Sequence, residues 1–225
     1  AKFPVILSGA GVVLSGAIPD LVRLAERLDA PVCSNYQHND SFPGSHPLAM
    51  GPLGYNGSKA GMEIIAKADV VLALGTRLNP FSTLPGYGID YWPKDAKIIQ
   101  VDINADRIGL TKKVTVGIQG DAGKVARGIL AQLADDAGDA GRQERRDLVA
   151  QTKSRWAQEL SSLDHEDDDP GTEWNAGARR RDADLMSPRQ AWRAIMQAMP
   201  QDAIVSSDIG NNCAIGNAYP TFEAG

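Results

Sequence analysis

The sequence is poor in cysteine and has no long apolar run. Cys33 and Cys213 are its two cysteines and form no Cys-x-x-Cys pair, so neither a disulfide framework nor a cysteine-rich zinc site is predicted. We expect two reduced, buried thiols, as in a cytoplasmic protein. The apolar run at residues 70–74 is among the longest, and a transmembrane helix needs about 20 residues.

Basic residues are also in the minority. The chain has 23 Lys and Arg against 28 Asp and Glu, a net charge of -5, which argues against a nucleic-acid surface. The basic run Arg179–Arg181 is followed at once by Asp182, which indicates a solvated linker rather than an anion site. His38 and His46 lie in loops without a third ligand pattern, so we expect hydrogen-bonded histidines and predict no metal-binding residue.

Apolar strands alternate with amphipathic helices over the first 135 residues. Continuous Val, Ile and Leu runs are typical of parallel strands buried on both faces. The pattern therefore predicts a doubly wound parallel sheet with helices on both sides. We expect strands at residues 2–8, 31–33, 69–74, 96–101 and 114–118, helices at 18–28, 59–67 and 122–134, and irregular segments at 35–57 and 79–94.

Composition divides the chain into three expected parts. Residues 1–135 form the central α/β domain, residues 136–186 a helix and a charged linker, and residues 187–225 the truncated start of a second α/β domain. A helix is expected to begin at Pro188, with Ser187 as its N-cap, and a strand to follow from Ala203. Because core strands lie so near both ends, we interpret the chain as the middle of a longer enzyme.

A glycine turn follows the first strand. Gly9 and Gly11 are small enough to let backbone N–H groups approach a ligand at a helix N-terminus. Leu14 stands where the dinucleotide-binding fingerprint has its third glycine, so the turn departs from that fingerprint. A purely structural glycine turn is the equal alternative.

Polar residues follow two further strands, at the edge where ligands bind in open α/β sheets. Gly75, Thr76 and Arg77 follow one strand, and Asp102 and Asn104 follow the next. Asp102 is a candidate ribose ligand, and helix capping by Asp102 or Asn104 is the alternative. Together with Gly9 and Gly11, these residues form a candidate nucleotide site, functional or vestigial.

The strongest local pattern lies near the carboxyl end. Asp208, Gly210, Asn211 and Asn212 follow the expected strand at Ala203. Glycine permits a sharp turn there, and the amides and a helix N-terminus can hold phosphate oxygens. A capped helix start without a ligand is the alternative.

Five segments together resemble a known family. They are residues 4–12 (Pro-Val-Ile-Leu-Ser-Gly-Ala-Gly-Val), 24–32, 42–48 (Phe-Pro-Gly-Ser-His-Pro-Leu), 68–77 and 96–104. In this order they resemble the central domain of thiamine-diphosphate-dependent enzymes related to acetolactate synthase. The resemblance covers nearly the whole chain except the linker.

The resemblance implies a three-domain subunit that binds thiamine diphosphate and Mg²⁺. The catalytic Glu would come from an N-terminal domain and the metal motif from a C-terminal domain, so no catalytic residue is predicted in this chain. Asp208–Asn212 would be the first loop on the diphosphate side. The family also implies a homodimer or homotetramer with active sites between subunits.

Residues 87–93 and 206–220 resemble the branch of the family that acts on sulfoacetaldehyde. That branch implies phosphate as the acetyl acceptor, acetyl phosphate and sulfite as products, and a role in taurine breakdown. Acetolactate synthases usually have Gln-His in place of Asn211-Asn212. They also carry an Arg-Phe-Asp-Asp-Arg type segment for FAD, from which Arg77–Phe81 departs, and this argues against FAD.

Two alternatives stay open. An acetolactate synthase-like carboligase or decarboxylase would be indicated by a tightly bound flavin. A stand-alone nucleotide-binding module is the second, although such a module has no reason to run into the pattern at Asp208. On the enzyme reading, the chain alone is expected to be inactive, because the catalytic Glu and the metal motif are not in it.

Overall fold

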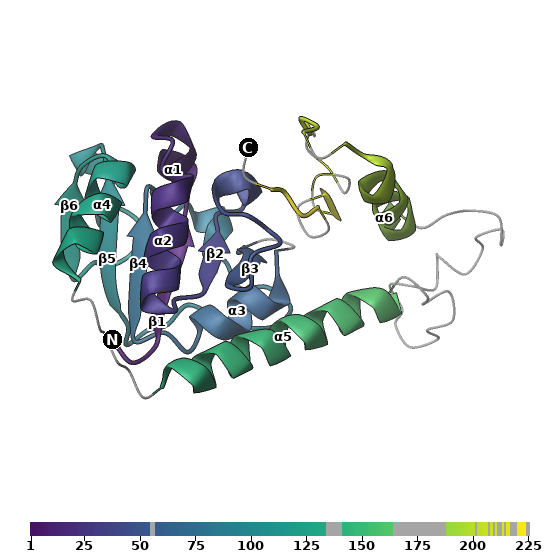
Figure 1. The fold of residues 1–225 in the computed structure, drawn as a ribbon, viewed down its shortest axis with the longest axis horizontal. Coiled ribbons are helices and arrows are strands. Elements are labelled where there is room, and N and C mark those ends of the chain that lie inside the picture. Colours follow the sequence, from purple (N-terminus) through teal and green to yellow (C-terminus); the bar gives the residue numbers. More distant parts are fainter. Residues whose placement is uncertain are drawn as a thin grey trace.

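A computed structural model describes residues 1–54, 57–133, 141–163, 188–200, 202–206, 208, 210, 213, 215–216 and 220–223. The described residues contain one six-stranded parallel sheet with strand order β3-β2-β1-β4-β5-β6 (Figure 1). The strands are β1 (Pro4–Ser8), β2 (Val32–Ser34), β3 (Ala49–Pro52), β4 (Val70–Leu74), β5 (Lys97–Asp102) and β6 (Val116–Gln119). This is a doubly wound order whose direction reverses between β1 and β4, and it confirms the predicted fold class.

Alternate residues of the central strands pack on opposite faces of the sheet. Ile6 of β1 pairs with Leu72 of β4, and both face α1 (Ala10–Leu14), α2 (Ile18–Leu28) and α4 (Ala122–Gln132). Leu7 and Ala73, one residue further on, belong to the other core, with α3 (Lys59–Ile65). Burial on both faces explains why β4 is apolar at every position and β1 is apolar from Pro4 to Leu7.

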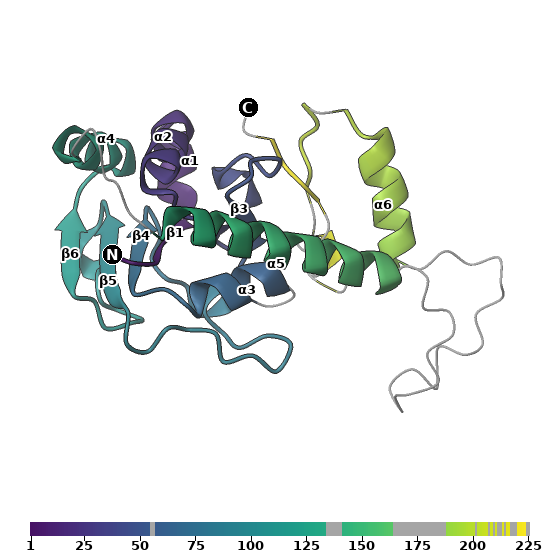
Figure 2. The ribbon, with the colours of Figure 1, turned by 60° about the horizontal axis from the view of Figure 1, so that its bottom comes forward.

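A long charged helix, α5 (Arg142–Leu163), packs on the central domain. It runs beside α3 in both views of the ribbon (Figures 1 and 2). Val149 and Thr152 of this helix are buried, and Trp156 meets Tyr87 edge-on with ring centroids 5.7 Å apart. The helix expected in the linker therefore contributes side chains to the core on the α3 side of the sheet, while the domain boundary at residue 135 stays a prediction.

Two elements were missed in the sequence. The polar segment 35–57 contains strand β3, and the glycine turn continues into the short helix α1. Ala49–Pro52 has neither alternation nor β-branched residues, so nothing local indicates a strand. It forms because β2 offers an open edge, where Val32 N–H donates to the Leu48 carbonyl at 2.8 Å and Leu53 N–H to the Ser34 carbonyl at 2.9 Å.

The prediction of a strand from Ala203 was wrong. Residues 203–206 are irregular, pair with no strand in the described ranges, and leave Ile204 98% exposed. An apolar run becomes a stable strand only beside partner strands. The preceding helix, α6 (Pro188–Ala198), begins where expected. Among the described helices, none combines the length and apolarity needed to cross a membrane.

Candidate functional site

Several predicted site residues meet at the carboxyl edge of the sheet. Gly11, Gly75, Thr76, Arg77 and Asp102 all line one pocket of about 430 Å³. We call it the carboxyl-edge pocket. It lies where the turn after β1 meets the turn after β4, the crevice in which doubly wound folds bind ligands.

The predicted site glycines are fixed by contacts between backbones, and Gly9, unlike Gly11 and Gly75, does not line the pocket. Gly9 N–H donates to the Leu74 carbonyl at 3.2 Å, and Gly11 N–H donates to the Gly75 carbonyl at 2.8 Å. A Cβ on Gly11 would lie 2.7 Å from Gly75 Cα, and Gly75 itself has a φ of +61°. Both N–H groups thus already donate to backbone carbonyls at and after the end of β4. A phosphate in the pocket would therefore need other hydrogen-bond donors.

The two residues after Gly75 differ in their surroundings. Thr76 is buried, and its Oγ1 accepts a hydrogen bond from Leu78 N–H at 3.2 Å. Its carbonyl accepts one from Gln100 Nε2 at 3.1 Å. Arg77 is exposed and lines the pocket, so it brings a guanidinium to the pocket wall, whereas Thr76 fixes the turn that carries it.

Two carboxylates also line the pocket and cap turns. Asp102 Oδ1 accepts a hydrogen bond from Asn104 N–H at 2.9 Å, and Asp121 Oδ1 accepts one from Lys124 N–H at 2.9 Å. Asp121 is thus the N-cap of α4. Asn104 caps the 3₁₀ turn Ala105–Arg107 and does not line the pocket. Each aspartate uses Oδ1 for this capping hydrogen bond.

Two apolar residues at this pocket were not recognised in the sequence. Leu14 is 85% exposed and Ile103 is 72% exposed, and both line the carboxyl-edge pocket. In the sequence, Leu14 only occupies the position of the third fingerprint glycine, and Ile103 only separates Asp102 from Asn104. Ile103 directly follows β5 and Leu14 ends α1, and both are large apolar side chains outside the core.

The described residues of the predicted diphosphate-side loop do not line this pocket. Asp208 and Gly210 are exposed, and neither lines the carboxyl-edge pocket. Gly210 has a φ of +135°, which suits glycine, and a Cβ there would meet nothing within 4 Å. Asn211 and Asn212 lie outside the described residues. Asp208 and Gly210 alone do not form an enclosed cradle for a diphosphate.

The residues expected to have structural roles are hydrogen-bonded or buried. His46 Nδ1 accepts from Leu48 N–H at 3.1 Å, and His38 Nδ1 lies 3.6 Å from Asp40 Oδ1. Cys33 is a buried free thiol whose pKa is raised by burial. Cys213 is also in no disulfide but is only half-buried, so the prediction of two buried thiols holds for Cys33 alone. No group of three metal-ligating side chains occurs in the described ranges.

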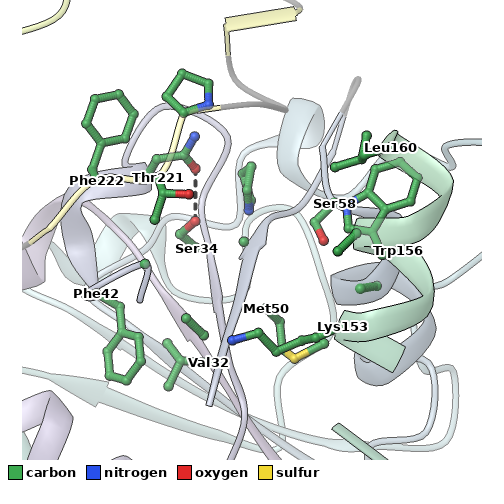
Figure 3. Close-up of a pocket in the computed structure, with 18 residues that line it drawn as sticks. Val32, Ser34, Phe42, Met50, Ser58, Lys153, Trp156, Leu160, Thr221 and Phe222 are labelled. Carbon is green, nitrogen blue, oxygen red and sulfur yellow. Dashed lines mark hydrogen bonds between the residues drawn. The ribbon is translucent and has the colours of Figure 1, made fainter. Parts of the chain in front are cut away.

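A second cavity, of about 260 Å³, lies between the β2–β3 edge and α5. We call it the edge cavity. Figure 3 shows Lys153 extending from α5 into it, with Phe42, Met50 and Trp156 among the surrounding side chains. Lys153 Nζ donates to the His46 carbonyl at 2.9 Å and to the Pro47 carbonyl at 3.3 Å. No sequence pattern indicates this site, because Lys153 is one of many charged residues on its helix.

Comparison with known proteins connects this fold to one family. Residues 1–129 match the family described as "Thiamine pyrophosphate enzyme, central domain". Over all 225 residues the chain is 76% identical to "Probable sulfoacetaldehyde acetyltransferase" of Rhizobium meliloti and 76% identical to "Sulfoacetaldehyde acetyltransferase" of Roseovarius nubinhibens. It spans 38% and 37% of the lengths of these relatives.

A more distant relative names a different activity. "Probable acetolactate synthase large subunit" of Methanocaldococcus jannaschii is 42% identical over 130 residues, which are 58% of this chain and 22% of that protein. The family match covers the sheet and the carboxyl-edge pocket, because β1 to β6 and the start of α4 all lie within residues 1–129. The chain therefore belongs to the thiamine pyrophosphate enzyme family and contains its central domain.

Proposed function

We propose that this chain is part of a thiamine-diphosphate-dependent acetyltransferase that converts sulfoacetaldehyde and phosphate to acetyl phosphate and sulfite. The observation that supports this function is the 76% identity over all 225 residues to relatives whose names state it. The acetolactate synthase relative reaches 42% over 130 residues. In the proposed reaction the carbon–sulfur bond breaks and an acetyl–oxygen bond to phosphate forms.

The proposed cofactors are thiamine diphosphate and Mg²⁺, with the ion held by oxygen ligands. Family membership supports thiamine diphosphate. We propose Asp208, Gly210, Asn211 and Asn212 as this chain's contribution to the diphosphate side. The catalytic Glu and the metal ligands would come from other parts of the whole protein, which we propose to be a cytoplasmic homodimer or homotetramer.

The acetolactate synthase-like alternative makes a different cofactor prediction. Flavin binding in that branch uses a segment from which Arg77–Phe81 departs. In this chain Leu78 is buried with a φ of +54°, and Asn79 caps the next turn by accepting from Phe81 N–H at 2.9 Å. These structural roles explain why Leu78 and Asn79 stand at these positions without any contact to a flavin. The whole purified protein is therefore expected to carry no yellow chromophore.

We further propose that the carboxyl-edge pocket binds a nucleotide. Asp102 and Asp121 would accept hydrogen bonds from ribose hydroxyls, and Arg77 would pair with a phosphate. Leu14 and Ile103 offer apolar surface to the base. In this arrangement the glycines shape the pocket and donate nothing to the ligand.

Titration of ADP into the chain tests the pocket. Asp102→Asn is expected to weaken ADP binding several-fold, because a ribose hydroxyl loses a charged acceptor. Asn104→Ala is the matched control, since Asn104 caps the adjacent turn without lining the pocket. Equal weakening by both variants would show that the turn matters and the Asp102 carboxylate does not.

Sulfite release tests the acetyltransferase proposal. The whole protein is supplied with thiamine diphosphate, Mg²⁺, phosphate and sulfoacetaldehyde, and sulfite and acetyl phosphate are measured together. Sulfite that requires phosphate and matches acetyl phosphate in amount is the expected result. Consumption of pyruvate without any sulfite would instead favour an acetolactate synthase. In the same assay the 225-residue chain alone is expected to be inactive.

A further inference from the structure

The edge cavity contains a cation with no acidic partner. Lys153 Nζ donates to two backbone carbonyls, those of His46 and Pro47, and forms no ion pair within the part of the chain that the structure describes. Its neighbour on the same side of the domain, Lys59, pairs with Glu159 at 2.9 Å. The described lining of the edge cavity includes Lys153 and no aspartate or glutamate. This lining therefore carries one formal positive charge and no negative charge.

The partly buried surroundings of Lys153 make the charged form of its side chain energetically less favourable than in water. Burial lowers the pKa of the Lys153 ammonium, because the partly enclosed charge has lost water. Buried charges in proteins are normally paired or bound to an ion, since the transfer of an unpaired charge out of water is unfavourable. The two neutral carbonyls accept hydrogen bonds from the ammonium but do not neutralise its charge. An anion bound in the cavity would neutralise that charge.

A second donor and apolar walls complete the cavity. Ser58 is 5% exposed, and its Oγ accepts a hydrogen bond from Gly61 N–H at 3.1 Å, so the hydroxyl proton is left to donate. Phe42, Met50 and Trp156 line the same space, as Figure 3 shows. Ser34, Asn39 and Thr221 add polar atoms to the lining, where Ser34 Oγ donates to Asn39 Oδ1 at 3.0 Å. One cation, hydroxyl groups and apolar carbon surface together suit a small organic anion with one negative charge.

We propose that the edge cavity is a binding site for a small organic monoanion, a short-chain carboxylate or sulfonate, with Lys153 as its counter-ion and Ser58 as a second donor. The volume of about 260 Å³ limits the ligand to a few carbon atoms beyond its acidic group. The site uses none of the residues proposed for thiamine diphosphate or for the nucleotide. It goes beyond the proposed function and does not depend on it.

Binding of defined probes tests this site. Propionate, ethanesulfonate and inorganic phosphate are titrated separately into the chain and followed by heteronuclear NMR of the backbone amides around residues 44–53. Saturable shifts with propionate or ethanesulfonate are expected, and the stronger of the two identifies the acid group. Lys153→Gln keeps a hydrogen-bond donor but removes the charge, and is expected to weaken binding at least tenfold. Lys97→Gln, at an exposed position on β5, is the matched control and should bind normally.

A second measurement covers the case in which Lys153→Gln fails to fold. In the wild-type chain, acetic anhydride acetylates accessible amines, and mass spectrometry gives the rate at each lysine. Either monoanion should slow acetylation of Lys153 and leave that of Lys97 unchanged. The proposal is overturned if neither monoanion binds saturably, if phosphate alone binds, if Lys153→Gln binds as well as wild type, or if Lys153 is not protected.

Discussion

Asp29 Oδ1 accepts a hydrogen bond from Arg146 Nε at 2.7 Å, which joins the end of α2 to α5. Asp29 is the C-cap of α2, is 4% exposed and has a φ of +47°. Its other oxygen lies 3.2 Å from Arg142 Nε, a charge contact without hydrogen-bond alignment. Arg145 continues the junction by donating to the Lys2 carbonyl at 2.7 Å. The start of α5 is therefore tied to the central domain by arginines.

Asp29→Asn tests this junction. Asparagine tolerates the left-handed backbone of this position, so the substitution removes charge with little added strain. The free energy of unfolding is expected to fall by about 1–3 kcal/mol, because Arg142 and Arg146 lose their charged partner. Urea denaturation measures the change, with the exposed Asp95→Asn as control. Equal stability of wild type and Asp29→Asn would show that the arginines are as well solvated without it.

Gly11→Ala tests the backbone packing beneath the carboxyl-edge pocket. A Cβ there would lie 2.7 Å from Gly75 Cα, and neither backbone can move without opening the turn. We expect a loss of about 1–3 kcal/mol in unfolding free energy, as for other overpacked sites. Gly128→Ala is the matched control, since a Cβ at this site in α4 meets nothing within 4 Å. In urea denaturation it should raise stability by about 0.5–1 kcal/mol through helix propensity.

Asp20 gives the chain a defined sensitivity to acid. Burial raises the pKa of the Asp20 carboxyl, but hydrogen bonds from Arg127 and Arg23 outweigh burial and hold this pKa below its usual range. A lowered folded-state pKa stabilises the fold above the unfolded value, about 3.9, and this stabilisation is lost as the pH falls through the folded value. The unfolding free energy of wild type should therefore fall more steeply below about pH 4 than that of Asp20→Asn. Urea denaturation at a series of pH values compares the two slopes, and parallel slopes would contradict the assignment.

The two thiols should differ in reactivity. Cys33 is fully buried and burial raises the pKa of its thiol, so little thiolate is available for reaction. Cys213 is half-buried, with its Sγ 3.9 Å from the Tyr36 hydroxyl oxygen. Iodoacetamide is expected to modify Cys213 in the native chain and Cys33 only after unfolding. Peptide mass spectrometry measures both rates, and rapid native labelling of Cys33 would show that the sheet opens locally.

The sheet was predictable because the burial of its central strands is visible in the sequence as continuous apolar runs. Val70–Leu74 is apolar at every position since both of its faces are covered, and helices such as Ile18–Leu28 show a clear apolar stripe. Strand β3 was not predictable, because its pairing depends on the open edge of β2 rather than on its own residues. The strand expected at Ala203 failed for the converse reason: its apolar residues have no partner strand among the described residues.

The candidate sites also contain some residues that could be predicted from the sequence and others that could not. Gly11, Gly75 and Asp102 could be found because strand ends in a parallel sheet share one edge. The occupation of the glycine N–H groups by strand-end carbonyls could not be predicted, because it depends on how closely two turns approach. Lys153 could not be found at all, since only the packing of α5 places it in a cavity. The oligomeric state, the cytoplasmic location and the role of Asn211 stay predictions.

Asn211→Ala in the whole protein tests this chain's proposed contribution to the cofactor site. If the Asn211 amide donates to a phosphate oxygen, its loss should weaken thiamine diphosphate binding about tenfold. Asn79→Ala is the control, because Asn79 caps a turn in the central domain by accepting from Phe81 N–H at 2.9 Å. Cofactor affinity is measured by fluorescence titration, and thermal unfolding without cofactor shows whether either variant is destabilised. A lower melting temperature at unchanged affinity would mean that Asn211 only caps a helix, whereas weaker binding at unchanged stability would assign it to the diphosphate.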